Sequence, residues 1–368
     1  MITEPRSFLR YSPNVEEIGP GEAETADAIT DAMRSIMQKN IERCGHAVQP
    51  SHGKSHGAVT GELTVLDGLA EPYRQGLFAE PRSYPVIVRL AHVPGEILED
   101  DKGPSTPRGM SIKVLGVDGP KIDGHQGEST QDFVLDTGKV FPASNAKVFL
   151  GTIKALDMGT DAPEGVKKAV SVASRGTNAL LHGLGIDSAN MDFFGHEPLH
   201  PLAESYFSQA PLRYGDYVAK LGVYPVNEPL RSLVGERIRL GDDKDALRHC
   251  VIDYFSRNDA EYEVRIQLCT DLDRMPVEDA HKAWDEDASP YVAVARLRLP
   301  AQAAYTETRR AYVDDALSFS PGHSLEAHRP LGSIMRARLR AYPAISSERR
   351  RSNGDAVREP AGAAEAPA

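Results

Sequence analysis

The stretch YPVIVRLAHV (84–93) is built from apolar and β-branched residues, and Arg89 interrupts it. Short runs of this kind between Gly, Pro and Asp turns are typical of strands. Six further segments share the pattern. They are GELTVLDGL (61–69), GMSIKVLGV (109–117), STQDFVLD (129–136), YGDYVAKLGVYPV (214–226), EYEVRIQLCTD (261–271) and SPYVAVARLRLP (289–300). Many short strands of this kind predict an antiparallel sheet that closes as a barrel.

Apolar residues at helical spacing mark the segments around these strands. Helices are predicted at 22–43, at 144–158, within 163–185 and at 245–255. The helices do not alternate regularly with the strands, as they would in a parallel α/β fold. The predicted class is therefore α+β, an antiparallel β-barrel with flanking helices.

Three parts of the chain are expected to differ in character. Residues 1–45 have the pattern of an N-terminal arm, interrupted by prolines, followed by a helix. Residues 46–352 carry the predicted strands and the C-terminal helices. Residues 353–368 are rich in Ala and Pro, a composition that predicts disorder.

Composition narrows the function classes. The formal net charge of −11 argues against a general nucleic-acid-binding protein. The start MITEPRSFLR lacks the apolar core of a signal peptide, and no apolar run suits membrane insertion. The three cysteines have no metal-binding spacing, and their odd, low number favours a reducing compartment with free thiols. These features predict a soluble, cytoplasmic protein.

The stretch PSHGKSHG (50–57) places His52 and His56 four residues apart. Histidines at this spacing share a face, and can chelate zinc, only if the segment is helical. Its two glycines and its proline work against a helix. A zinc site would need further ligands, for which His46 is the nearby candidate. The alternatives are thus a zinc hydrolase site and a polar loop that enters a strand.

Three other residues suggest chemistry. Arg89 in a strand is either exposed at an edge or buried against an anion. Arg338 and Tyr342 are four residues apart in a segment that is expected to be helical up to Pro343, so they share a face. A guanidinium there stabilises a phenolate, which is a recognised ligand of haem iron. The alternative is a solvated, arginine-rich helix.

Taken together, these segments resemble the catalase superfamily, in particular its small catalase-related haem peroxidases. Six stretches carry the resemblance in the family's order. They are HGKSHGAVTGELTV (52–65), VIVRLAHVPGE (86–96), TPRGMSIKVLG (106–116), QDFVLDTGKVF (131–141), HKAWDEDASPYVAVARLRL (281–299) and LSFSPGHSLEAHRPLGSIMRARLRAYP (317–343). The family fold is an antiparallel β-barrel with flanking helices, and the resemblance covers nearly the whole chain.

The resemblance implies haem b as cofactor. His52 matches the family's distal histidine, which acts as the catalytic base. Tyr342 matches the axial ligand of the iron, and Arg338 matches the arginine that keeps this tyrosine ionised. The implied activity is peroxidase chemistry, which reduces hydrogen peroxide or organic hydroperoxides at the expense of a small electron donor.

The resemblance also implies the residues around the haem. Arg89 and Arg349 match arginines that pair with the haem propionates. Phe141 and Phe149 match aromatic positions beside the haem. Small catalase relatives are often dimers, so a homodimer is an open expectation.

Several positions depart from the family pattern. Asp136 replaces the distal asparagine, Ala91 replaces the serine that supports the distal histidine, and Gln49 replaces an arginine. We also expect the longer C-terminal helical domain of catalases to be absent. An ionised Asp136 beside His52 would favour the imidazolium, or Asp136 would itself act as the base. We therefore expect weak catalase activity.

Two alternatives to peroxidase activity follow from the altered distal residues. One is an enzyme that rearranges fatty-acid hydroperoxides, similar to allene oxide synthase. The other is a haem-binding protein that has lost catalysis.

Overall fold

The computed structural model describes residues 7–93, 106–160, 196–354 and 359–360, and nine strands lie within them. They are β1 (Ser55–Val65), β2 (Ser83–His92), β3 (Arg108–Leu115), β4 (Thr130–Thr137), β5 (Tyr206–Phe207), β6 (Leu212–Tyr214), β7 (Tyr217–Pro225), β8 (Ala260–Leu268) and β9 (Val292–Leu299). The helix predicted within 163–185 lies outside the described residues.

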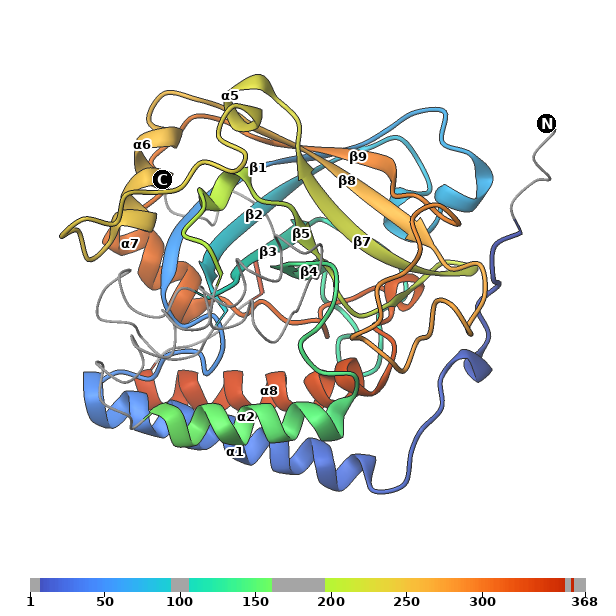
Figure 1. The fold of residues 1–368 in the computed structure, drawn as a ribbon, viewed down its shortest axis with the longest axis horizontal. Coiled ribbons are helices and arrows are strands. Elements are labelled where there is room, and N and C mark those ends of the chain that lie inside the picture. Colours follow the sequence, from blue (N-terminus) through green and yellow to red (C-terminus); the bar gives the residue numbers. More distant parts are fainter. Residues whose placement is uncertain (1–6, 94–105, 161–195, 355–358, 361–368) are drawn as a thin grey trace, which may run out of the picture.

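The sheet is a closed antiparallel barrel. Its strand order is β5-β4-β3-β2-β1-β9-β8-β7-β6, and β5 pairs with β7 as well as with β4. This second pairing closes a ring of eight strands and leaves β6 as a hairpin partner of β7 outside the ring. The prediction of an antiparallel barrel with flanking helices is confirmed (Figure 1).

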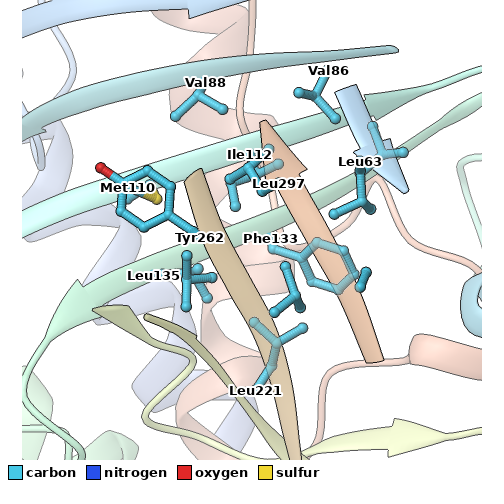
Figure 2. Close-up of a cluster of buried hydrophobic side chains, with 14 of the residues drawn as sticks. Leu63, Val86, Val88, Met110, Ile112, Phe133, Leu135, Leu221, Tyr262 and Leu297 are labelled. Atoms are coloured by element: carbon cyan, nitrogen blue, oxygen red, sulfur yellow. The ribbon is translucent and has the colours of Figure 1, made fainter. Parts of the chain in front are cut away.

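Alternation along the strands fills the barrel with apolar side chains. Val86 and Val88 of β2 point inward beside Ile112 of β3, and Phe133 and Leu135 of β4 lie near them (Figure 2). Residues two apart on a strand share a face, so the intervening positions point out of the barrel. The apolar set of each strand therefore fixes which of its polar residues face outward.

The outward face of β2, β3 and β4 is polar yet buried. Arg89, Lys113, Asp132 and Asp136 are each at most 8% exposed. The register places Ile87, Lys113 and Asp132 in one row across the three strands. Ile87 packs in a small apolar cluster with Val313, Leu317 and Phe319, which belong to the segment before the last helix. This segment therefore covers the polar face.

Helices cover the barrel outside. They are α1 (Glu22–Cys44), α2 (Ala146–Thr160), α5 (Glu228–Arg231), α6 (Ala246–Phe255), α7 (Glu307–Arg310) and α8 (Ser333–Asn353). One turn of π-helix, η5 (Ala311–Ala316), and the 3-10 turns η1 (Pro13–Val15), η2 (Glu71–Tyr73), η3 (Gly76–Phe78), η4 (Pro201–Ala203) and η6 (Glu326–His328) complete the set. Helices α1, α2 and α8 form one layer beside the barrel (Figure 1).

The layer of α1, α2 and α8 has its own apolar core. Ile36 and Met37 of α1 share it with Ile153 of α2 and with Ala341 and Ile345 of α8. The helical periodicity of 22–43 and 144–158 predicted the first two helices to within two residues at each end. None of the helices within the described ranges is both long and apolar enough to cross a lipid bilayer.

Three local predictions were wrong. Helix α8 continues through Pro343 to Asn353, because packing of its last turns on α1 outweighs the missing N–H of the proline. The segment 214–226 is not one strand, since a turn at Gly215 separates β6 from β7. Strand β1 begins at Ser55 rather than at residue 61, and its first residues pair with β2.

The close approach of β1 to β9 requires a glycine at position 61. A Cβ on Gly61 would lie 2.2 Å from the carbonyl oxygen of Arg298, a main-chain atom that cannot move aside alone. We predict that Gly61→Ala lowers the free energy of unfolding by about 2 kcal/mol, because strand separation strains the ladder. Urea unfolding measures this change.

The matched control for this variant is Gly151→Ala. Gly151 lies on the exposed face of α2, with open space where a Cβ would stand. Alanine favours the helix there, so the control should raise stability by about 0.5–1 kcal/mol. Equal effects of the two substitutions would contradict the close approach at Gly61.

Candidate functional site

A cavity opens between the barrel and the layer of α1, α2 and α8. Its space, including the part open to solvent, is about 740 Å³, and sixteen residues line it. They are Met33, Pro50, Ser51, His52, Val93, Pro107, Asp136, Phe141, Pro142, Phe149, Thr152, Ile153, Leu156, Gln209, Arg338 and Tyr342. A second hollow of about 410 Å³ shares four of these residues and adds Arg349. Of the residues that the resemblance assigns to haem binding and catalysis, all but Arg89 therefore line one of the two hollows.

His52 is held by its main chain in an unusual conformation. Its φ of 57° is in the left-handed region, which non-glycine residues rarely adopt. Its N–H donates to the carbonyl of Val93 over 2.8 Å, and its own carbonyl accepts from Nη2 of Arg89 over 2.8 Å. Strand β2 and the residue that follows it therefore fix the turn that carries the imidazole, and the strain is absorbed locally.

The imidazole of His52 lies against the main chain of β3. A Cβ on Gly109 would lie 2.3 Å from Nδ1 of His52, so only glycine leaves room for the ring. Gly109 pairs in register with Asp136 of β4, which brings the carboxylate to the same place. The distance from His52 Nε2 to Asp136 Oδ1 is 3.6 Å. The structure thus brings His52 and Asp136 together.

Burial sets the protonation of this pair. Loss of solvent, together with the charges of Arg89 and Arg338, lowers the pKa of His52 to about 3. Burial raises the pKa of Asp136 to about 6, although Arg338 opposes the shift. Near neutral pH the imidazole is neutral and the carboxylate is ionised, while below pH 6 both are neutral. The imidazolium expected from an adjacent carboxylate is therefore not the favoured form.

Tyr342 lines the cavity from α8. Nη2 of Arg338, one helical turn earlier, donates to its hydroxyl oxygen over 2.8 Å. The guanidinium carbon of Arg338 also lies 5.1 Å from the centre of the phenol ring. The pair shares a helix face as its spacing predicts, and Arg338 is buried rather than solvated. The alternative of a solvated arginine at position 338 is thus wrong.

Aromatic and apolar side chains form much of the remaining wall. The rings of Phe141 and Phe149 meet edge to face with their centres 5.0 Å apart. Met33 of α1 and Ile153 and Leu156 of α2 line the cavity beside them. These walls suit a flat or elongated apolar ligand rather than a strongly charged one.

Arg89 is buried against an anion, not exposed at an edge. Its side chain is 2% exposed, and its Nε donates to Oδ1 of Asp314 over 2.7 Å. Ser55 donates to the other oxygen of Asp314, over 2.7 Å. Arg349 of α8 donates to the main-chain carbonyls of Asp314, Asp315 and Leu317. The donor groups of both arginines therefore have partners inside the protein, and their pairing with propionates stays a prediction.

The three histidines of the suggested zinc site do not come together. His46 pairs with Asp315, over 2.8 Å, at the covering segment. His56 lies in β1 and stacks on His92 with ring centres 4.4 Å apart. Because residues 50–57 form a loop and a strand start, positions 52 and 56 do not share a helix face. No cluster with potential metal ligands forms around His52 in the described ranges.

Sequence reasoning missed two residues on which the site depends. Asp314 supplies the anion that a buried strand arginine demands, and Gly109 leaves space for the imidazole. The buried charge of Arg89 signalled that a carboxylate must exist, but not where in the chain it lies. The adjacent acids Asp314 and Asp315 were the available signal.

Comparison with known proteins identifies the fold. The structure is similar to a fungal catalase (TM-score 0.59, 18% identity), to catalase A from Saccharomyces cerevisiae (0.59, 16%) and to a bacterial catalase (0.56, 13%). The fold is catalase-like. Each alignment covers 95% of this chain and 66%, 68% and 64% of those catalases, so the chain spans about two thirds of their length. No family model and no curated protein matches the sequence.

The residues in the cavity fit a haem. Nδ1 of His52 and Oδ1 of Asp136 are buried and have no hydrogen-bond partner among the described residues. The Arg338–Tyr342 pair offers an oxygen ligand suited to ferric iron, and the apolar walls suit a porphyrin.

The raised pKa of Asp136 predicts a pH-dependent stability. A carboxyl whose pKa rises from 3.8 to about 6 on folding contributes stability below pH 4 that is lost as the pH passes 6. Asp136→Asn removes this dependence. We predict that the free energy of unfolding of Asp136→Asn, relative to that of the wild type, rises by about 3 kcal/mol from pH 4 to pH 8. Urea unfolding at the two pH values measures this difference.

The control is Asp118→Asn, because the Asp118 side chain is 85% exposed. Its stability difference from the wild type should stay flat over the same pH range. A flat difference for Asp136→Asn as well would show that Asp136 is ionised in the folded protein throughout.

Proposed function

We propose that the chain binds haem b in this cavity and acts as a peroxide-dependent oxidoreductase of the catalase type. A single observation carries the proposal. A buried neutral imidazole with a free carboxylate oxygen beside it and an arginine-bound phenol line the same cavity in a catalase-like fold.

Tyr342 is the proposed iron ligand, and Arg338 stabilises its phenolate. Phe141 and Phe149 form the wall beside the cofactor, and Arg349 reaches the adjoining hollow. When bound, haem would supply an iron centre that accepts electrons from the donor and delivers them to the O–O bond. The phenolate is an anionic ligand, which favours cleavage of that bond.

His52 and Asp136 are the groups proposed to bind and transfer the peroxide proton. General acid–base catalysis works best when the pKa of the group lies near the operating pH. Asp136, with a pKa of about 6, is then the stronger acceptor of the peroxide proton near neutrality, while the neutral His52 ring donates or accepts a hydrogen bond. The same carboxyl returns the proton to the leaving oxygen. Catalases have an asparagine at this position, which cannot accept the proton. Because Asp136 departs from that arrangement, we propose weak disproportionation of hydrogen peroxide.

The apolar wall favours organic hydroperoxides as substrates. Met33, Phe149, Ile153 and Leu156 offer an alkyl or acyl chain a surface that hydrogen peroxide does not use. A small electron donor completes turnover in the peroxidase case. Rearrangement of a fatty-acid hydroperoxide, which needs no donor, is the second candidate that this wall supports.

Substitution of Tyr342 tests the proposed ligand. Tyr342→Phe keeps the ring but removes the coordinating oxygen, so we predict that haem is lost during gel filtration while the wild type retains it. The haem-to-protein absorbance ratio measures retention. Tyr305→Phe is the control, because Tyr305 donates to Glu307 and does not line the cavity. Equal retention by both variants would rule out Tyr342 as the ligand.

Substitutions of the distal pair test the proton chemistry. We predict that His52→Ala keeps haem and lowers peroxidase kcat/KM by about two to three powers of ten, because the hydrogen bond from the ring that positions the peroxide is lost. In the wild type, activity should rise as the pH passes 6, because the Asp136 carboxyl becomes a base. This rise of activity with pH should be absent in Asp136→Asn.

The same assay separates the alternatives. Faster turnover of a fatty-acid hydroperoxide than of hydrogen peroxide, without a donor, would favour rearrangement. Haem binding with no saturable turnover of either peroxide would indicate a protein that has lost catalysis. Full activity in His52→Ala would contradict the proposed role of His52.

A further inference from the structure

A third hollow lies on the covered polar face, lined by residues outside the distal pair. Its space, including the part open to solvent, is about 820 Å³, and His125, Glu128, His323 and Glu359 are among the residues that line it. His125 and Glu128 belong to the connection between β3 and β4, whereas His323 follows η5 almost 200 residues later. The hollow thus lies where two distant segments meet.

Three side chains there offer metal ligands at close range. One nitrogen from each of His125 and His323 and one carboxylate oxygen of Glu128 all lie within 4.8 Å of one another. Zinc bonds of about 2.0–2.1 Å in a tetrahedron separate ligand atoms by roughly 3.4 Å. Side-chain rotations that move the donor atoms by about one ångström therefore bring the three donors into coordination range. This is the sole such cluster in the part of the chain that the structure describes.

His323 is oriented as metal-bound histidines are. Its Nδ1 lies 2.8 Å from Oδ2 of Asp132, a fully buried carboxylate. Lys113 holds Asp132 through both oxygens, each over 2.9 Å, and the N–H of Ser320 also donates to it. Nδ1 also lies 3.1 Å from Nζ of Lys113, a group that can only donate. Asp132 and Lys113 therefore hold the ring through this one nitrogen, and a carboxylate behind a histidine in this way orients it as a ligand.

The surroundings leave room for a cation and a further carboxylate oxygen that has no partner. A Cβ on Gly322 would lie 2.6 Å from Nε2 of His125, so the glycine lets this ring approach the chain. Oε1 of Glu359 is buried without a hydrogen-bond partner among the described residues. The carboxylates of Glu128, Asp132 and Glu359 lie near three cationic side chains, Lys113, Lys121 and Arg350. The side chains of His125 and Glu128 are 15% and 24% exposed, which leaves an entry path from solvent.

We propose that His125, Glu128 and His323 form a zinc site, with a water or the free oxygen of Glu359 as fourth ligand. Two imidazoles and one carboxylate are a donor set typical of zinc. The ion would tie the β3–β4 connection to the segment that covers the polar face and leads into α8. This site neither uses nor requires the proposed haem.

Calorimetric titration of untagged protein with zinc chloride, after dialysis against a chelator, tests the site. We expect one zinc per chain and a rise in the melting temperature when zinc is added. His125→Ala and Glu128→Gln, which change partly exposed side chains, should each weaken binding at least tenfold and abolish most of the rise in melting temperature. Calcium should not compete, because two nitrogen ligands disfavour it.

His249→Ala is the matched control. His249 pairs with Asp243 over 2.6 Å on the surface but has no third donor nearby. This variant should bind zinc as the wild type does. The proposal is overturned if wild-type protein binds no zinc, or if His125→Ala and Glu128→Gln fold, as judged by circular dichroism, and bind it with unchanged affinity. A loss of affinity in His249→Ala as large as in His125→Ala would equally contradict it.

Discussion

The buried charge of Arg89 is the constraint on which the candidate site depends. A guanidinium at 2% exposure requires a carboxylate, and Asp314 of η5 supplies it over 2.7 Å. The same guanidinium donates to the main-chain carbonyl of His52, so the Arg89–Asp314 pair fixes the turn that carries His52. Arg349 of α8, the helix that carries Tyr342, donates to the main-chain carbonyl of Asp314. One ion pair thus links both walls of the cavity, and loss of either partner would leave a buried charge uncompensated.

The two faces of strands β2, β3 and β4 have different roles in the structure. Inward residues such as Val88 and Ile112 form the barrel core, and the alternate positions carry Arg89, Lys113 and Asp136 outward. Because a covering segment buries these polar groups, their protonation is set by burial as well as by charge. The exchange of asparagine for Asp136 therefore changes more than hydrogen bonding, since it introduces a group that titrates near pH 6 on the proposed peroxide side.

Local pattern predicted the parts of this structure that depend on neighbours in sequence. Alternation predicted the strands, and the spacing of Arg338 and Tyr342 predicted their contact. The approach of His52 to Asp136 depends on the register of Gly109 between distant strands, which no spacing encodes. The resemblance to catalases supplied that pairing. Neither source revealed Asp314, and Pro343 misled because tertiary packing outweighs its helix-breaking tendency.

The central claim is that this cavity is a haem site with Tyr342 as the iron ligand. Titration of the purified wild-type protein with haem, followed by its absorption spectrum, tests the claim most directly. The account predicts a Soret band that saturates at one haem per chain, with the spectrum of a ferric haem bound to a phenolate. A spectrum that stays that of free haem, or binding without saturation, would contradict it.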